Sequence, residues 1–413
     1  MNFPDGFLWG TATAAHQVEG GNVNTDCWVL EHIKSTRFAE PSGDACDQYH
    51  RYADDIAMVA RLGFNAYRFG IEWARVEPED GEFSAAEIEH YRRVLAACHE
   101  NGITPFVTMH HFTSPRWIAA RGGWEANETA DRFARFCGRV GHDLGDLIGG
   151  ACPINELNAV QMFQSMGAIP ADEKMLRART RREAAQALGV PPDSFSAFPF
   201  CSRGICRDVI LRGHRLGGDA LRAGRGKFPV GMSVTMGEAH AEPGGEALRD
   251  RVMAESDTIF LEAARKDDFV GVQTYTRQRF GPDRPLGPEK GVELTTMGYE
   301  FRPQALEATI RRASKVAGVP IYVTESGIAA EDDSRRVEFI KGALASVRHC
   351  LTDGIDVRGY FYWSMLDNYE WLLGYKQRFG IIAVDRTTQQ RTAKPSAKFL
   401  GAIARSHGAD LQA

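Results

Sequence analysis

Short apolar runs alternate with segments of helical periodicity along most of the chain. The runs span residues 7–14, 65–73, 103–112, 151–156, 229–236, 268–275, 320–325 and 357–363. Continuous apolar runs of this kind are typical of strands that are buried on both faces of a sheet. Because a helical segment separates each run from the next, the pattern predicts a parallel sheet covered by helices.

The segments between these runs place apolar residues on one face of a helix. In one of them, Ile56, Val59 and Leu62 form such a face, and Gly63 follows as a stop signal. Further helices are predicted near residues 84–102, 207–224, 248–266, 303–317 and 335–351, and another should start after Asn127, a favourable N-cap residue. The chain is therefore interpreted as eight strand–helix units.

Eight such units without a linker rich in Gly, Ser or Pro predict an α/β fold, a single (β/α)8 TIM barrel over residues 1–413. A doubly wound open sheet is the alternative, but no glycine-rich phosphate-binding motif follows the first strand. Residues 21–46, 164–206 and 277–298 are irregular and too long for simple connections. We expect these three stretches to form elaborated loops around the C-terminal mouth of the barrel.

The composition is that of a globular protein with a large core, since 43% of the 413 residues are hydrophobic and 25% are charged. A formal net charge of −5, with no zinc-finger, P-loop or arginine-rich segment, argues against nucleic acid as a partner. No run of about 18 apolar residues predicts a membrane span. The first 20 residues lack a basic leader and a long apolar run, so we expect a cytoplasmic protein.

Several of the eight cysteines occur at positions that suit small core residues, as Cys98, Cys137 and Cys152 do. We expect them to be reduced and buried. For Cys201 and Cys206, which lie close together in the sequence, a loop disulfide or a metal clip is the alternative.

Two of the predicted strands end in a glutamate. Glu156 ends the fourth strand and Glu325 ends the seventh. In a barrel, the carboxyl ends of all strands meet at one mouth, so both side chains should point into it. Two carboxyl groups there suit glycoside hydrolysis, in which one protonates the leaving oxygen while the other attacks or activates water. The acid needs an environment that holds its proton, and the nucleophile needs donors that keep it ionised.

The chain resembles the family-one glycoside hydrolases, the retaining β-glucosidases and β-galactosidases, over nearly its whole length. The resemblance rests on the segments FLWGTATAAHQVEG, ACDQYHRYADDIAMVARLGFNAYRFGIEWARVEPEDGEF, GITPFVTMHHF, NEL, VTESG and WSMLDNYEWLLGYKQRFGI. It implies that Glu156 is the acid/base and Glu325 the nucleophile. It also implies that Arg68 and Tyr275 flank the nucleophile, where a guanidinium and a phenol would donate to its carboxylate.

The same resemblance implies a set of sugar-binding residues. Gln17, His111 and Asn155 match residues that hydrogen-bond sugar hydroxyls. Trp363, Glu370 and Trp371 match the family residues that form an aromatic platform for the sugar ring and contact its distal hydroxyls. An indole wall with polar groups at its edge suits the CH faces and hydroxyl edges of a sugar.

The two adjacent histidines leave an alternative open at this site. We assign the sugar contact to His111 and expect His110 to be a core or supporting residue. A two-histidine metal site has no third ligand at a suitable spacing, so no metal and no cofactor is expected.

Several positions depart from the family pattern. Leu157 follows the acid/base in place of proline, Ser326 follows the nucleophile in place of asparagine, and Gln273 replaces the asparagine two residues before Tyr275. Phe112 and Thr113 stand where Trp-Asp is common. In the fourth strand, Pro153 lacks a ladder donor, and we expect it to force a local bulge.

The resulting hypothesis is an exo-acting, retaining β-glycosidase that hydrolyses small neutral β-glycosides. Glucosides are the main expectation, with galactosides and fucosides as further candidates. Glu156 argues against the thioglucosidases of the family, which have glutamine there, and an acidic Glu370 argues against phosphorylated sugars. A transglycosidase that uses the same two glutamates is one alternative, and a sugar-binding pseudoenzyme is another.

Overall fold

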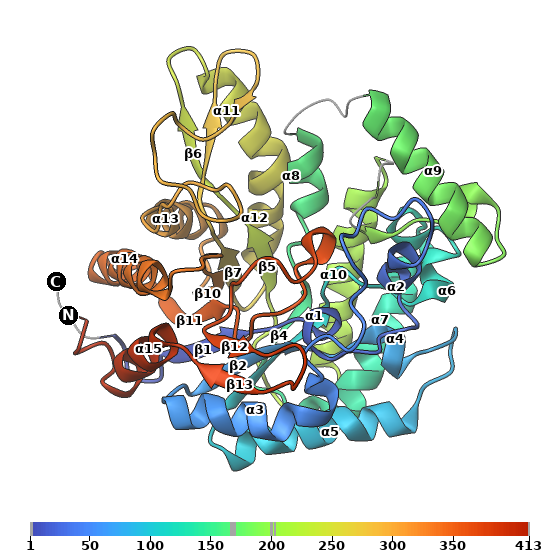
Figure 1. Ribbon diagram of the computed structural model, residues 1–413, viewed down its shortest axis with the longest axis horizontal. Coiled ribbons are helices and arrows are strands. Elements are labelled where there is room, and N and C mark those ends of the chain that lie inside the picture. Colours follow the sequence, from blue (N-terminus) through green and yellow to red (C-terminus); the bar gives the residue numbers. More distant parts are fainter. Residues whose placement is uncertain (1–2, 166–170, 199–200, 202–203, 412–413) are drawn as a thin grey trace.

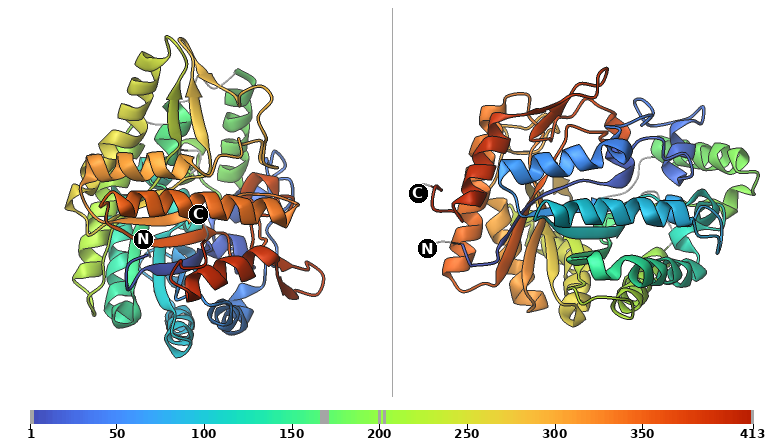
Figure 2. Two further views of the ribbon diagram at one scale, coloured as in Figure 1. Left: turned by 90° about the vertical axis from the view of Figure 1, so that its left-hand side faces the viewer. Right: turned by 90° about the horizontal axis from the view of Figure 1, so that it is seen from below.

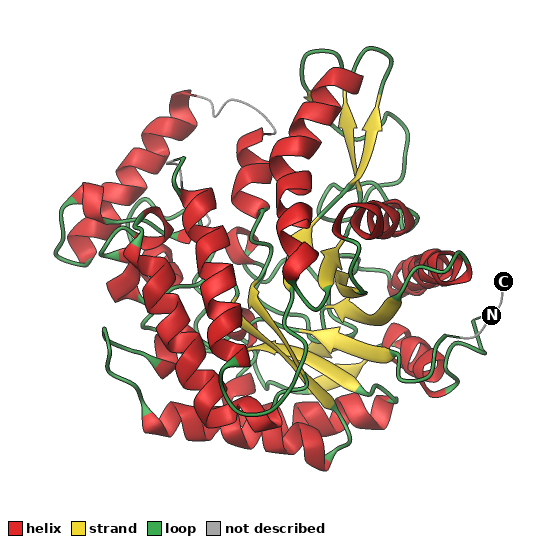
Figure 3. Cartoon of the chain, turned by 180° about the vertical axis from the view of Figure 1, so that it is seen from behind, coloured by secondary structure: helices red, strands yellow, loops and turns green. Residues whose placement is uncertain are grey.

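The computed structural model describes residues 3–165, 171–198, 201 and 204–411. In this part of the chain, eight parallel strands form a central sheet that helices surround (Figure 1, Figure 3). The strands are β1 (Leu8–Ala12), β2 (Ala66–Gly70), β3 (Thr104–His110), β4 (Gly150–Ile154), β5 (Met232–Thr235), β7 (Val270–Gln273), β10 (Ile321–Ser326) and β11 (Val357–Trp363). All eight predicted strands are confirmed.

The sheet closes into a barrel because its first and last strands pair. The order around it is β4-β3-β2-β1-β11-β10-β7-β5. β1 runs parallel to β11 from the pair Leu8↔Gly359 to the pair Ala12↔Trp363. The two ends of this order meet between β4 and β5, where the described residues form one bridge, Ala151↔Val230. The predicted (β/α)8 barrel is confirmed, and the doubly wound alternative is wrong.

A ring of helices covers the outside of the barrel. The helices are α3 (Gln48–Leu62), α5 (Ala85–Glu100), α7 (Glu128–Leu144), α10 (Cys206–Arg222), α11 (Glu246–Met253), α12 (Ile259–Ala263), α13 (Ala305–Ala317), α14 (Asp333–Thr352) and α15 (Pro395–Arg405). The sequence pattern predicts all of them except α15. It predicts α11 and α12 as a single helix, whereas in the structure a π-helical turn (Ala254–Thr258) lies between them. The two termini lie beside each other near α14 and α15 (Figure 2).

The ends of the helices confirm one predicted signal and correct another. Gly63 ends α3 with φ 103°, a left-handed conformation that glycine adopts without strain. Asn127 does precede α7, but its own backbone is already helical (φ −57°, ψ −36°) and its side chain caps no N–H. The expected capping role of Asn127 is therefore wrong, although the position of the helix is right.

Aromatic rings that face strand glycines fill the interior of the barrel. The ring of Phe106 lies 5.4 Å from that of Phe269 and 5.3 Å from that of Phe361. A Cβ on Gly10 would lie 2.4 Å from the Phe361 ring, and one on Gly150 would lie 2.6 Å from the Phe106 ring. Glycine at these two positions makes room for the rings, which pack into a floor beneath the strand ends.

Pro153 does not cause the predicted bulge in β4. This strand pairs with β3 in unbroken register from Phe106↔Gly150 to His110↔Ile154. On its other edge, the bridge to β5 is at Ala151, before the proline. Because proline lacks only an N–H donor, a strand edge where the ladder is already short accommodates it without an extra residue.

The three long stretches form additional structure at the mouth. The first contains α2 (Asp26–Glu31), and the second contains α9 (Ala171–Ala187), so residues 164–206 are not irregular throughout. Residues 166–170, 199–200 and 202–203 of that stretch lie outside the described part of the chain. The third contains β8 (Arg277–Phe280) and β9 (Pro285–Leu286), which form a small sheet with β6 (Glu238–Ala241). As predicted, all three stretches contribute to the wall of a cavity at the mouth.

Several short elements complete the described chain. They are α1 (Ala15–Val18), α4 (Trp73–Val76), α6 (Arg116–Ala119), α8 (Ala159–Ser165), β12 (Ile382–Val384) and β13 (Arg391–Ala393). All eight cysteines are buried free thiols, so neither Cys201 nor Cys206 forms a disulfide. Among the described helices, none has the length and apolar character needed to cross a membrane.

The first prediction concerns the close packing between α7 and α10. A Cβ at position 224, just after α10, would lie 2.3 Å from the backbone of Gly141, so Gly224→Ala should destabilise the fold by about 1–3 kcal/mol. At position 138 of α7, a Cβ would meet Ala220 at 3.7 Å, an ordinary contact. Gly138→Ala should therefore stabilise the helix by about 0.5–1 kcal/mol. Urea unfolding measures both, and equal effects would contradict this account of the packing.

Candidate active site

Glu156 and Glu325 reach one cavity from two strands of the barrel. Glu325 lies at the end of β10, and Glu156 is the second residue after β4. The chain turns sharply at Glu156, whose φ of 42° lies in the left-handed region, a conformation that is strained for a residue with a Cβ. Both carboxyl groups line a cavity of about 430 Å³ at the mouth of the barrel. The two strand ends therefore meet as the sequence predicts.

The cavity gathers most of the predicted site residues in its wall. Those that line it are Glu156, Glu325, Tyr275, His111, Trp363, Glu370 and Trp371. Arg68, Asn155 and Gln17 lie behind this wall, each with an exposed fraction of 0%. Arg68 hydrogen-bonds Glu325, and Asn155 hydrogen-bonds His111, so these two contact the cavity wall directly. Gln17 instead donates to the Tyr369 carbonyl and to Asn368 Oδ1.

Two donors hold the carboxylate of Glu325. Arg68 Nη1 donates to Oε1 over 2.7 Å, and the Tyr275 hydroxyl donates to Oε2 over 2.5 Å. Burial raises the pKa of Glu325 above its ordinary value, while the Arg68 charge and both hydrogen bonds oppose that rise. Both carboxylate oxygens are thus occupied by groups that favour the ionised form.

Glu156 has a different electrostatic environment. Burial, and after it the negative charge of Glu325, raises the pKa of Glu156 to about 8. A carboxyl group in this setting keeps its proton at pH 7. The two glutamates therefore differ in the way that an acid and a nucleophile must differ.

Asn155 links Arg68, the partner of Glu325, to His111 in the cavity wall. Its Oδ1 accepts hydrogen bonds from Arg68 Nη2 at 2.5 Å and from Gln273 Nε2 at 2.8 Å. Two donors on one oxygen fix the orientation of the amide, so its Nδ2 faces His111 Nε2 at 3.1 Å. Gln273, one of the departures from the family pattern, thus supports Asn155 directly.

This orientation sets the tautomer of His111. Burial, Arg68 and His110 hold the pKa of His111 well below its usual value, so the ring is neutral. Since Nε2 accepts from Asn155, the hydrogen is on Nδ1, which has no hydrogen-bond partner among the described residues. A buried donor of this kind needs an acceptor, and a sugar hydroxyl can supply it.

His110 has the supporting role predicted for it. It is 1% exposed, it lies 3.0 Å from Ser114 Oγ, and its Nε2 accepts from Trp124 Nε1 at 3.1 Å. Burial lowers its pKa to about 3. In the described part of the chain, no group of three or more His, Cys, Asp or Glu residues could hold a metal ion.

Two tryptophans form the aromatic wall of the cavity. The Trp363 ring stacks on His111 with centroids 5.6 Å apart and an interplanar angle of 20°. The Trp371 ring lies nearly parallel to His16, at 5.8 Å and 5°. Phe112 meets Trp371 edge-on at 5.5 Å. The replacement of the usual tryptophan by Phe112 therefore keeps an aromatic residue in the wall, with a smaller ring.

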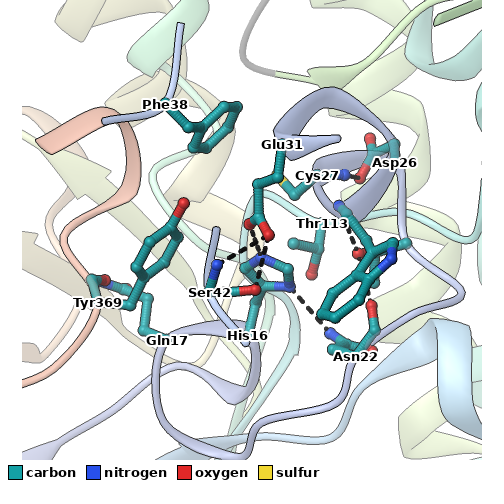
Figure 4. A network of polar contacts seen from close by, with 12 residues as sticks. His16, Gln17, Asn22, Asp26, Cys27, Glu31, Phe38, Ser42, Thr113 and Tyr369 are labelled. Atoms are coloured by element: carbon teal, nitrogen blue, oxygen red, sulfur yellow. Dashed lines mark hydrogen bonds and ion pairs between the residues drawn. The ribbon is translucent and has the colours of Figure 1, made fainter. Parts of the chain in front are cut away.

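A polar network behind the wall holds His16 and Gln17 in place (Figure 4). His16 Nε2 lies 2.7 Å from Glu31 Oε1, and Asn22 Nδ2 lies 3.2 Å from His16 Nδ1. Gln17 donates to the Tyr369 carbonyl at 2.7 Å, while its own Oε1 has no partner among the described residues. Sequence reasoning did not identify His16 or Glu31 as part of the site, although His16 adjoins Gln17 in the first quoted segment.

The surroundings of Glu370 favour its protonated form at pH 7. Burial and the charge of Glu325 raise its pKa to about 8. Its Oε2 has no partner in the described part of the chain. A neutral carboxyl group repels an anion less than the carboxylate expected from the sequence, so charge repulsion is a weaker argument against phosphorylated sugars than we predicted. Such a group can donate to one hydroxyl and accept from another.

Two further departures have structural roles. Leu157 is fully buried in the core, and the Thr113 hydroxyl donates to Glu72 at 2.9 Å. The cavity wall also includes residues that the sequence did not point to, namely Cys27, Arg37, Phe38, Arg177, Phe198, Met297, Tyr299, Leu372 and Phe379. Most come from loops, where no periodic pattern indicates which side chains face inward.

Comparisons with known proteins identify the family to which the chain belongs. The chain matches glycosyl hydrolase family 1 over residues 1–184 and 225–409. A thermostable β-glucosidase B of Thermobispora bispora is 32% identical, over 99% of this chain and 92% of its own. A bifunctional β-D-glucosidase/β-D-fucosidase of Bifidobacterium breve is 30% identical, over 96% of both chains. A β-glycosidase crystal structure with 52% identity matches with a TM-score of 0.94, over 98% of this chain and 97% of that one.

The barrel and its paired carboxyl groups define an O-glycoside hydrolase. More specifically, the chain belongs to glycosyl hydrolase family 1.

The buried carboxyl groups predict how stability depends on pH. A pKa raised from 4.5 to about 8 means that folded Glu370 keeps its proton where the unfolded chain loses it. Its favourable contribution is complete below pH 4.5 and disappears as the pH rises through 8. Glu370→Gln cannot ionise, so between pH 5 and pH 8.5 its free energy of unfolding should rise by about 4 kcal/mol relative to that of the native protein.

The measurement is urea unfolding of both proteins at the two pH values. Glu82→Gln, at an exposed position, is the matched control and should follow the native protein. A Glu370→Gln variant with the native pH dependence would show that this carboxyl group does not carry the effect.

Proposed function

We propose that the protein is a retaining, exo-acting β-glycosidase and principally a β-D-glucosidase. The observation that carries the proposal is the contrast between the two carboxyl groups of one cavity. Glu325 is held by Arg68 and Tyr275, whereas Glu156 has a pKa of about 8. One group is prepared to attack and the other to donate a proton.

In the first step, Glu325 attacks the anomeric carbon and the glycosidic bond breaks. Glu156 transfers its proton to the leaving oxygen, so the aglycone departs as a neutral alcohol or phenol. The product is a glycosyl ester on Glu325, and Arg68 and Tyr275 remain beside it. Retention follows because a second displacement inverts the anomeric centre again.

In the second step, Glu156 acts as the base. Formation of the ester removes the negative charge of Glu325, which is one of the two leading causes of the raised pKa of Glu156. The pKa of Glu156 should therefore fall once the ester has formed. The resulting carboxylate accepts a proton from water, whose oxygen attacks the anomeric carbon and releases Glu325.

The sugar would bind between the aromatic wall and the orphaned polar atoms. Trp363 offers a platform for its CH face, and His111 Nδ1, Gln17 Oε1 and Glu370 Oε2 lack partners among the described residues. Donors and acceptors of this kind suit the hydroxyls of a neutral hexose. Galactosides and fucosides are further candidates, and a relative with both glucosidase and fucosidase activity in its name supports that range.

We also propose that residues 1–413 form one catalytic domain, that no cofactor takes part, and that the protein works in the cytoplasm. Support for the location comes from the eight buried free thiols, because cysteines in oxidising compartments are commonly paired.

Replacement of the two glutamates tests the proposal. Glu325→Ala should abolish hydrolysis of 4-nitrophenyl β-D-glucoside. Glu156→Ala should lower kcat/KM by about 10²–10⁴-fold for a phenyl glucoside, whose leaving group needs protonation, and far less for a 2,4-dinitrophenyl glucoside. Glu262→Gln, at an exposed position of α12, is the control and should keep full activity.

Covalent labelling separates the alternatives. A 2-deoxy-2-fluoro glucoside with a good leaving group should label Glu325 stoichiometrically, as peptide mass spectrometry would show. Failure of labelling together with tight sugar binding would establish a sugar-binding pseudoenzyme. Transfer products that outweigh glucose when an alcohol is added would identify a transglycosidase.

The pKa of Glu156 predicts the alkaline limb of the pH profile. Because the acid must carry its proton, kcat/KM for an aryl glucoside should fall as the pH rises through about 8. Glu156→Ala assayed with 2,4-dinitrophenyl glucoside should lack this limb. A native profile that stays flat to pH 9.5 would contradict the assignment.

A further inference from the structure

A second cavity, of about 520 Å³, adjoins the catalytic one. Its wall comes from α2, from the loop after it, from α9 and from residues 192–197. The charged residues in this wall are Arg37, Lys174, Arg177, Arg181, Arg182 and Asp193. Five cationic side chains against one acidic side chain give the cavity a positive character.

Two arginines belong to both cavities. Arg37 and Arg177 line the basic cavity and also the catalytic cavity that contains Glu156 and Glu325. The basic cavity contains none of the predicted site residues. Arg37 and Arg177 therefore lie where the catalytic cavity and the basic cavity adjoin.

Several charged groups in and near this wall have partners within the chain. Arg181 pairs with Glu125 at 2.9 Å, and Glu183 of α9 pairs with Arg179 at 2.9 Å. Arg37 and Arg177 also interact with other groups of the chain. A guanidinium has five N–H donors, so one that already has a partner still has donors for a carboxylate.

Aromatic residues line the same cavity as Glu156, Glu325 and the two arginines. They include Phe38, Phe112, Phe198 and Tyr299. The rings of Phe112 and Phe198 are stacked, with centroids 6.0 Å apart and an angle of 24°. Such a passage suits a flat apolar ring better than a second sugar.

We infer that this passage is the aglycone site and that it selects β-glycosides whose aryl aglycone carries a carboxylate. The inference rests on the proposed function and extends it: the sugar is neutral, and the charge is on the leaving group. The aryl ring lies among the aromatic residues, and its carboxylate reaches Arg37 and Arg177. The basic cavity beyond them leaves room for a longer acidic aglycone.

The test compares two aglycones of similar shape, in 4-carboxyphenyl and 4-carbamoylphenyl β-D-glucoside. Because the two phenols differ as leaving groups, the informative quantity is the acid-to-amide ratio of kcat/KM in each protein. Arg37→Gln/Arg177→Gln should lower this ratio by about tenfold, with little change for the amide. Arg179→Gln, on the same helix but in neither cavity, is the matched control and should leave the ratio unchanged.

Salt provides a second readout. The native acid-to-amide ratio should fall severalfold between 50 mM and 500 mM NaCl, and the ratio of the double variant should not. An unchanged ratio in a double variant that still hydrolyses the amide would overturn the inference. If neither glucoside were hydrolysed by the native protein, the proposed function itself would fail, so the two failures are distinguishable.

Discussion

The site depends on one buried cation. Arg68 is fully buried, and a guanidinium in that position needs anionic or polar acceptors to offset the loss of water. Glu325 and the Asn155 carbonyl supply them. The same contacts favour the ionised form of Glu325 and fix the amide that determines the tautomer of His111. Charge, orientation and hydrogen-bond direction at the base of the cavity thus share a single origin in β2.

Several features of the site destabilise the folded protein. Burial leaves Glu156 and Glu370 with pKa values of about 8, and Glu156 has a left-handed backbone. Each feature costs free energy that the barrel must offset, through the aromatic floor around Phe106 and the helices outside. Both glutamates lie above this floor, where rigid packing holds them despite their unfavourable environment.

The sequence predicts the barrel and its carboxyl pair because both depend on local patterns. Strand runs and helical faces are periodic, and a glutamate at a strand end has a defined place once the strands are parallel. The wall of the cavity has no such pattern. Phe38 and Phe198 come from loops far apart in the chain. The sequence of α9 itself has no clear apolar face that would have predicted this helix. Asn127 does not cap its helix and Pro153 does not cause a bulge. The local preference of a residue type is therefore overridden where the surrounding backbone hydrogen bonds favour another arrangement.

The junction of β4 and β5 is the weakest seam of the barrel, with one bridge among the described residues. The chain between these strands includes residues 185–224, which lie outside the family match. A barrel that is joined lightly there tolerates changes in the length of that connection without disturbing the other strand pairs. Changes in that connection can thus reshape the side of the cavity beside Glu156 while the surroundings of Glu325 stay constant.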